Sequence, residues 1–240
     1  RINAFIPTSD VEIIHSDAES YMKEIDRSTL PVVKESLGPC FAGCYTSMVR
    51  IKQANRRIEN KLALTEKALC YAGIDAGEKL RDAKKTLAFC QFHDILPGSA
   101  IKPVEDDSLR TFSYVEEIAD VLYDKAFFRL CAGQKKAKDK EIPVLVFNPH
   151  PYEIEGDFQV EFLLGEINEA EEEYTIARVY DENGEFLPTQ NEKPYATMHR
   201  DWTKRIAFHG KVAPSSVTRF DCKIEVVSTE SLKKNQGEPP

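Results

Sequence analysis

The chain has 240 residues, of which 42% are hydrophobic and 30% are charged, and its formal net charge is −8 at pH 7. This composition is typical of a globular protein with one large domain or two smaller ones. It argues against nucleic acid as a partner, because phosphate binding needs a concentrated basic face, and no apolar run approaches the ~20 residues that cross a membrane.

Cysteine usage indicates the cellular compartment. Four of the six cysteines lie in or beside apolar helical stretches, where a reduced thiol behaves as a small hydrophobic group. No CxxC pair is present, so we expect no structural zinc site. The sequence therefore predicts reduced thiols and a cytoplasmic location. The first residues do not form a secretory signal, and whether one preceded them is left open.

The first part of the chain, residues 1–36, carries no strong amphipathic pattern. A long amphipathic helix is expected next, after the loop residues 38–43. Thr46 or Ser47 can cap its start, apolar residues recur at three- and four-residue spacing as far as Ala72, and Gly73 ends it.

Two more amphipathic helices are predicted behind the first. One runs from about Asp75 to His93 and ends before Pro97 and Gly98, since proline disfavours helical geometry at the residue before it. The other begins near Pro103 and ends at Gly133. Short connections between the helices predict an up-down-up bundle.

The hydrophobic period changes from helical spacing to two after the polar linker 134–140. Asp181–Glu185 contains Asn-Gly and predicts a hairpin turn. Short alternating strands separated by turn signals predict an antiparallel β-sandwich-like domain. The expected strands are 143–148, 158–162, 174–180, 205–208 and 217–220.

The expected fold class is therefore α+β: a three-helix bundle followed by an antiparallel β-sandwich-like domain. The bundle is assigned to residues 37–134 and the β domain to residues 141–227. Residues 166–173 are predicted to form an acidic loop, and residues 228–240 a frayed tail.

Gln91-Phe92-His93-Asp94-Ile95-Leu96-Pro97-Gly98-Ser99 is the stretch that carries candidate chemistry. A neutral imidazole such as that of His93 is a good zinc ligand, and a neighbouring carboxylate such as Asp94 can tune the metal or hold a sugar hydroxyl. The alternative is a histidine that forms structural hydrogen bonds at a helix end, which the residues by themselves leave open.

Three segments together resemble the retaining α-mannosidases of glycoside hydrolase family 38. Gln91–Ser99 is similar to the family's His-Asp signature. Ala42–Ser47, with Lys52 and then Asn55-Arg56-Arg57 and Glu59, resembles its Gly-x-Tyr-Thr-Ser segment and the helix after it. Val146-Phe147-Asn148-Pro149 resembles the opening of its C-terminal β region.

The resemblance implies a role for each candidate residue. His93 would be a zinc ligand, Asp94 would line the sugar pocket, and Tyr45 would contact a sugar or a carboxylate, although a tyrosine packed at a helix entrance is nearly as good a reading. Arg56, Arg57 and Glu59 are expected to make helix-surface or interdomain pairs. The remaining histidines and Trp202 match no motif and are expected to be structural or surface residues; the histidines are His15, His150, His199 and His209.

The resemblance also implies what the chain lacks. Residues 1–36 would be the tail of the family's N-terminal catalytic domain, which would supply the aspartate nucleophile and the other zinc ligands. No catalytic residue is therefore assigned within this chain, and the chain alone is expected to be inactive. The intact enzyme would act on mannose-containing oligosaccharides with one zinc ion, and whether it forms a homo-oligomer is open.

Two alternatives stay beside this reading. The chain could be a non-catalytic carbohydrate-binding or oligomerisation module, or the bundle could serve other catalytic partners, because a fold does not fix a function. His93 and Asp94 distinguish an enzyme from an interaction module, since an interaction module has no need of them.

Overall fold

The computed structural model describes residues 10–36, 38, 41–168, 172–195, 201–228 and 230, without the side chains of residues 167 and 201. The chain divides into two compact units, Arg1–Gly43 and Cys44–Pro240. In the described part of the first unit, the short helices α2 (Ala18–Glu24) and η2 (Arg27–Thr29) bury no residue. The 3-10 turn η3 (Ala42–Tyr45) follows along the chain.

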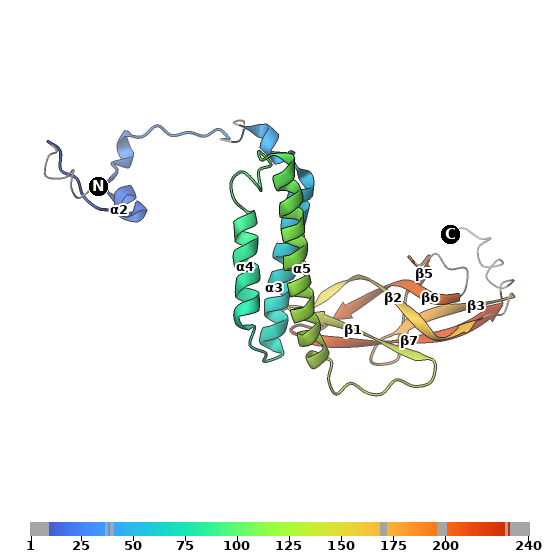
Figure 1. Cartoon of the computed structure of the whole chain (residues 1–240). Helices are drawn as coiled ribbons and strands as arrows, with labels where there is room; N and C mark the ends of the chain where they lie inside the picture. Colours follow the sequence, from blue (N-terminus) through green and yellow to red (C-terminus); the bar gives the residue numbers. More distant parts are fainter. Residues whose placement is uncertain are drawn as a thin grey trace. The chain divides into compact units, whose positions relative to one another are not determined.

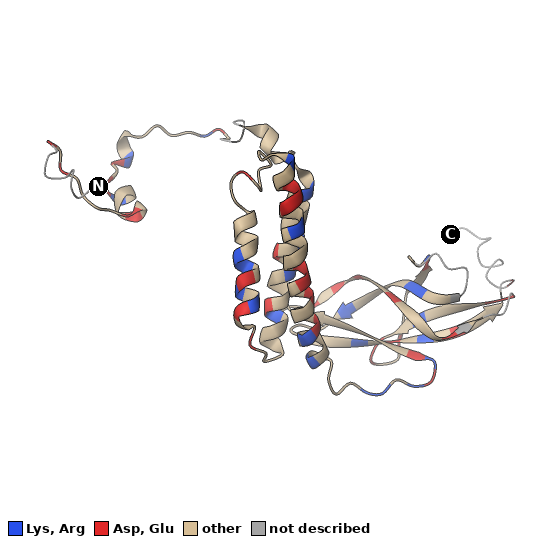
Figure 2. Cartoon of the chain, viewed as in Figure 1, with Lys and Arg blue, Asp and Glu red and all other residues tan. Residues whose placement is uncertain are grey.

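Three helices form the predicted bundle: α3 (Val49–Tyr71), α4 (Gly77–Cys90) and α5 (Lys102–Leu130) (Figure 1). Their apolar faces meet in one core that includes Ile51, Leu80 and Phe112. Acidic and basic side chains are interspersed along the outer faces of the helices (Figure 2), as expected for surfaces that contact water. No helix in the described part of the chain is long and apolar enough to cross a membrane.

Two helix boundaries differ from the prediction. Neither Thr46 nor Ser47 caps α3; instead Met48 precedes it in left-handed conformation, with φ of 44°. The second helix ends at Cys90 rather than His93, because its hydrogen bonds tighten to the i→i+3 type, as in the bond from the Phe92 N–H to the Phe89 carbonyl. His93 and Asp94 therefore lie in the turn between α4 and α5.

The β region contains two antiparallel sheets, as predicted. One sheet has the order β1 (Glu141–Asn148), β7 (Ser216–Ser228), β3 (Glu173–Tyr180) and β4 (Phe186–Leu187). The other has the order β2 (Ile154–Asn168), β6 (Asp201–Val212) and β5 (Thr189–Glu192). A second core lies in this region and includes Val144, Val179, Phe208 and Phe220.

The predicted strands are all present, and β4 and β5 were not predicted because both are short and Pro188 separates them. Gly184 adopts a φ of 84° in the expected Asp181–Glu185 turn. The expected acidic loop is narrower than predicted, because β2 continues to Asn168 and β3 begins at Glu173; residues 169–171 lie outside the described residues. So does most of the predicted frayed tail.

Candidate functional site

The candidate site lies on the exposed turn that joins α4 to α5. His93 Nε2 is 3.6 Å from Asp94 Oδ2, and the two side chains are 78% and 57% exposed. The hydroxyl of Ser99 donates to Asp94 Oδ1 at 3.1 Å, and the Phe92 ring lies 4.0 Å from the His93 ring between centroids. The structure therefore presents an imidazole and a carboxylate together to the outside.

The backbone of this turn is ordered by its own hydrogen bonds. The N–H groups of Ile95 and Leu96 both donate to the Phe92 carbonyl, and the Ala100 N–H donates to the Asp94 carbonyl. Between the two exposed residues and Pro97, the buried side chain of Ile95 packs into the helical core. One apolar anchor thus fixes the turn while its two polar neighbours stay in water.

Tyr45 lies at the end of η3, where its side chain is exposed. Two residues later, the Ser47 hydroxyl donates to the Gly98 carbonyl at 2.6 Å, so the segment that carries Tyr45 meets the turn that carries His93. In the described part of the chain, Tyr45 forms no hydrogen bond with His93 or Asp94. The structure thus brings two of the sequence motifs together, and the roles of the three residues stay predictions.

The donor set accounts for only part of a metal site. His93 offers an exposed ring nitrogen and Asp94 offers an oxygen, both suited to zinc. Catalytic zinc usually takes three protein ligands, and the described residues contain no cluster of three or more His, Cys, Asp or Glu side chains that could hold a metal. The pair therefore fits as one side of a metal site that needs further ligands from elsewhere.

The charged residues early in α3 divide into two sets. Arg57 forms a bidentate pair with Glu116 on α5, and Arg56 pairs with Glu59 at 3.1 Å, which confirms the predicted helix-surface pairs. Lys52 does something that the prediction missed: its ammonium binds backbone carbonyls in the His93 turn.

Asn55 and Glu59 also contact that turn, through Gln91. The sequence signal that could have predicted these contacts is the spacing of Lys52, Asn55 and Glu59, which places them on one face of a helix.

The other described histidines behave as expected. His209 is half exposed on β6, and hydrogen bonds with Asp157 and then Glu155 raise its pKa. His150 stacks on Tyr152 next to β1. Trp202 is half-buried in β6, and His199 lies outside the described residues.

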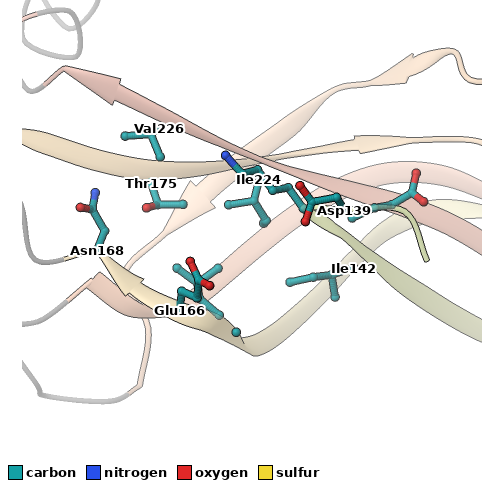
Figure 3. Close-up of a pocket in the computed structure, with 11 residues that line it drawn as sticks. Asp139, Ile142, Glu166, Asn168, Thr175, Ile224 and Val226 are labelled. Carbon is teal, nitrogen blue, oxygen red and sulfur yellow. The ribbon is translucent and has the colours of Figure 1, made fainter. Parts of the chain in front are cut away.

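A separate pocket of about 580 Å³ opens between strands of the β region. Figure 3 shows Glu166 and Asn168 on one side of it, opposite Thr175, Ile224 and Val226. Among the described residues, its lining contains charged, polar and aliphatic side chains but no aromatic side chain that could stack on a sugar. The lining residues are Asp139, Lys140, Glu141, Ile142, Leu164, Gly165, Glu166, Asn168, Thr175, Ile224 and Val226.

Comparison with known proteins identifies the helical part. Residues 40–130 match the family described as the alpha mannosidase middle domain. The chain is 28% identical to alpha-mannosidase 2C1 of Mus musculus over 116 residues, which cover 46% of this chain and 11% of that protein.

Two solved structures share the fold. An alpha-mannosidase from Enterococcus faecalis V583 has a TM-score of 0.58 and 19% identity, over 92% of this chain and 30% of its own. A glycosyl hydrolase family 38 protein from Enterococcus faecalis has a TM-score of 0.62 and 20% identity, over 88% of this chain and 28% of its own. The chain thus spans less than a third of the length of these relatives.

The bundle and the strands that follow it along the chain share the fold of these solved structures, one of which is described as a glycosyl hydrolase family 38 protein. More narrowly, the resemblance to the α-mannosidases of glycoside hydrolase family 38 is confirmed, and residues 40–130 match the alpha mannosidase middle domain.

Proposed function

We propose that this chain is part of a zinc-dependent retaining α-mannosidase that hydrolyses terminal α-mannosidic bonds in oligosaccharides or glycans. One observation carries the proposal: His93 and Asp94 are presented together on an exposed turn inside the matched α-mannosidase middle domain. In this proposal the chain contributes one zinc ligand and part of the sugar pocket, and residues 1–36, 37–134 and 141–227 are the catalytic-domain tail, the middle domain and the start of the β region.

Each candidate side chain has a definite task. His93 would hold the metal through its imidazole, and Asp94 would accept a hydrogen bond from a sugar hydroxyl. Tyr45 would contact the sugar or a carboxylate through its exposed phenol. A bound zinc ion would supply Lewis acidity that polarises sugar hydroxyls.

Retaining hydrolysis also needs two carboxylates about 5–5.5 Å apart, one as nucleophile and one as acid/base. We place the nucleophile and the remaining zinc ligands in an N-terminal catalytic domain. The length of the relatives, of which this chain covers less than a third, supports such a domain.

The surface around the turn supports a covering partner. The start of α3, the end of α4 and the start of α5 lie at the same end of the bundle, because successive helices run antiparallel. This end exposes several large apolar side chains, which usually mark an interaction surface when they gather. They are Tyr45, Val49, Phe89, Phe92 and Ile101.

The decisive test compares the full-length wild-type protein with His93→Ala, measuring zinc content and hydrolysis of an aryl α-mannoside. We expect both zinc content and activity to fall. The loss should exceed about 10–100-fold, which is the loss in metal affinity or activity when a residue that only supports a metal ligand is removed. His209→Ala, which removes an exposed histidine of β6, is the matched control and should change neither. If His93→Ala also changes neither, the proposal is wrong and the motif is structural.

A second test uses the 240-residue chain alone. With one histidine ligand it should bind zinc weakly and show no turnover of an aryl α-mannoside. Measurable turnover by the purified chain would contradict the proposed division of the active site. The cytoplasmic location also remains a prediction, which fractionation of the source cells would check.

The alternative is a non-catalytic carbohydrate-binding or oligomerisation module. The exposed apolar residues at this end of the bundle support such a module as much as they support a covering catalytic domain. Sedimentation of the 240-residue chain over a range of concentrations would show self-association through this surface. An oligomer that dissociates on Phe89→Ser, combined with a silent His93→Ala, would favour the module.

A further inference from the structure

We infer that one face of α3, together with Ser47 just before the helix, positions the His93–Asp94 turn. Ser47 and Lys52 hold the far side of the turn, which follows Asp94 in the chain, and Asn55 and Glu59 hold the near side, which precedes His93. These residues do not carry the chemistry; they fix the backbone that presents it. The inference rests on the proposed function for its effect on zinc, and on the structure alone for its effect on the backbone.

Lys52 holds the far side of the turn. Its ammonium donates to the carbonyls of Leu96 at 3.0 Å and Pro97 at 3.2 Å, and also to that of Ser47 at 2.5 Å. An ammonium has three donors, so all of them are used on backbone oxygens. Two of these oxygens follow His93 by only three and four residues.

Apart from these hydrogen bonds, the position of Lys52 is electrostatically unfavourable. It lies at the start of α3, where the positive end of the helix dipole disfavours a cation. Among the residues that the structure describes, it forms no salt bridge that would offset this cost. The three carbonyls are therefore the interactions that account for a lysine at this position.

Ser47 closes the same side. Its hydroxyl donates to the Gly98 carbonyl at 2.6 Å. Gly98 has a φ of +78°, and a Cβ there would lie 2.9 Å from the carbonyl carbon, carbonyl oxygen and Oγ of Ser47. The contact is therefore so close that the turn needs glycine at this point for two independent reasons, backbone conformation and space.

Gln91 attaches the near side of the turn to the same helix. Its side-chain amide donates to Asn55 Oδ1 at 3.1 Å and to Glu59 Oε1 at 2.8 Å. Asn55 is buried, and the second oxygen of Glu59 is also buried and lies 3.1 Å from Arg56. Gln91 precedes His93 by two residues.

The helix spaces these attachments. Lys52, Asn55 and Glu59 stand at positions i, i+3 and i+7, so they share one face of α3. They bind the turn at Gln91 and again at Leu96–Pro97, and His93 and Asp94 lie exposed between these two attachment points. A ligand held in place before its partner arrives loses less conformational freedom on binding, so this arrangement should raise metal affinity.

The first experiment measures the backbone of the 240-residue chain by amide hydrogen exchange. Lys52→Met should accelerate exchange of the Gly98 and Ala100 amides by about tenfold or more, because hydrogen bonds to a charged group are lost locally. Lys67→Met is the matched control, since it removes an exposed lysine of the same helix, and it should leave these amides unchanged. Equal exchange in both variants would overturn the inference.

The second experiment measures zinc affinity of the full-length protein by competition with a chromogenic chelator. Lys52→Met should weaken zinc binding about 10–100-fold, as loss of outer-shell partners does, and Lys52→Arg should recover part of the loss. A role in stability alone would lower the melting temperature and leave zinc affinity unchanged, and that outcome would overturn the inference.

Two further variants keep the test decisive. If Lys52→Met does not fold, Gln91→Met removes the near attachment point and should weaken zinc binding in the same direction. His93→Ala separates the two proposals: if it leaves zinc affinity unchanged, the proposed function fails, and the hydrogen exchange then decides the positioning role of α3 by itself. If His93→Ala abolishes zinc binding while Lys52→Met and Gln91→Met do not weaken it, only the positioning role of α3 fails.

Discussion

Side chains bind backbone groups beside both ends of α3, with different consequences. At its start, the side chains of Ser47 and Lys52 bind backbone carbonyls of a turn whose charged residues face outward. At its end, Tyr71 packs edge-on against Phe147, and Asn148 beside it is almost completely buried, at 1% exposure.

Asn148 satisfies the backbone around it. Its amide donates to the carbonyls of Tyr152, Val212 and Ala213, and its oxygen accepts from the His150 N–H. The comparison teaches that burial sets the energetic weight of such contacts. Asn148 is buried and closes the β region on itself, whereas Ser47 and Lys52 are half-buried and fix the shape of a turn that presents exposed residues.

Replacing Asn148 tests the buried contacts and should give the largest effect. Asn148→Ala removes the side chain that contacts three carbonyls and one N–H in a buried or half-buried place, which should lower the free energy of unfolding by about 3 kcal/mol. Urea denaturation of the 240-residue chain measures it. Asn60→Ala on the exposed face of α3 is the control, and a loss below about 1 kcal/mol for Asn148→Ala would remove the distinction between the two ends.

Gly98→Ala tests the contact between the His93 turn and the start of α3. The alanine would have to adopt a φ of +78° and place its Cβ 2.9 Å from Ser47, so we expect a loss of about 2–3 kcal/mol. Gly184→Ala is the matched control, because its φ is +84° but nothing lies within 4 Å of the new Cβ. The difference between the two unfolding free energies isolates the contact with Ser47, and equal losses would show that the contact contributes nothing.

The elements were readable from the sequence because their patterns are long. The three helices and the main strands follow apolar periods of 3.6 and two over many residues, so tertiary packing and local pattern agree. The short β4 and β5 were not readable, because two apolar residues before Pro188 and four polar residues after it are too few to show a period.

Helix ends were less predictable for a physical reason. Ser47 has the chemistry of an N-cap, but its hydroxyl is used by Gly98, 51 residues away, and a contact of that range leaves no local signal. The candidate residues His93 and Asp94 came from a motif, whereas the grip of Lys52 on their turn needs coordinates to be seen. Their roles in binding remain predictions.

Tyr71→Phe sharpens the comparison at the C-terminal end of α3 with a smaller change. The Tyr71 hydroxyl donates to Ser215 Oγ at 2.8 Å, while the ring contact with Phe147 would remain. Because Tyr71 is partly open to water, the loss should be about 0.5–1 kcal/mol in urea denaturation. Tyr114→Phe, on the exposed face of α5, should cost less, and an equal cost would show that the Ser215 contact is not what holds this joint.

The Arg57–Glu116 pair provides the reference, because it joins α3 to α5 through a surface ion pair and involves no backbone group. The hydrogen bond from Arg57 lowers the pKa of Glu116 and raises that of Arg57. A carboxylate with a lowered pKa contributes stability above its unfolded pKa and loses it as pH falls through the folded pKa. The stability difference between wild type and Arg57→Met should therefore be present at pH 6 and vanish towards pH 3.

The size of that difference decides what the reference means. The Arg57 and Glu116 side chains are 57% and 23% exposed, so water and salt screen the pair, and we expect less than about 1 kcal/mol at pH 6. Urea denaturation of wild type, Arg57→Met, Glu116→Gln and the double variant at both pH values isolates the coupling, because Lys61 also lies 3.6 Å from Glu116. A coupling as large as the effect of Asn148→Ala would mean that exposure does not govern these contacts. A small coupling that disappears in acid would leave burial as the variable that separates the contacts of Asn148 from this surface ion pair.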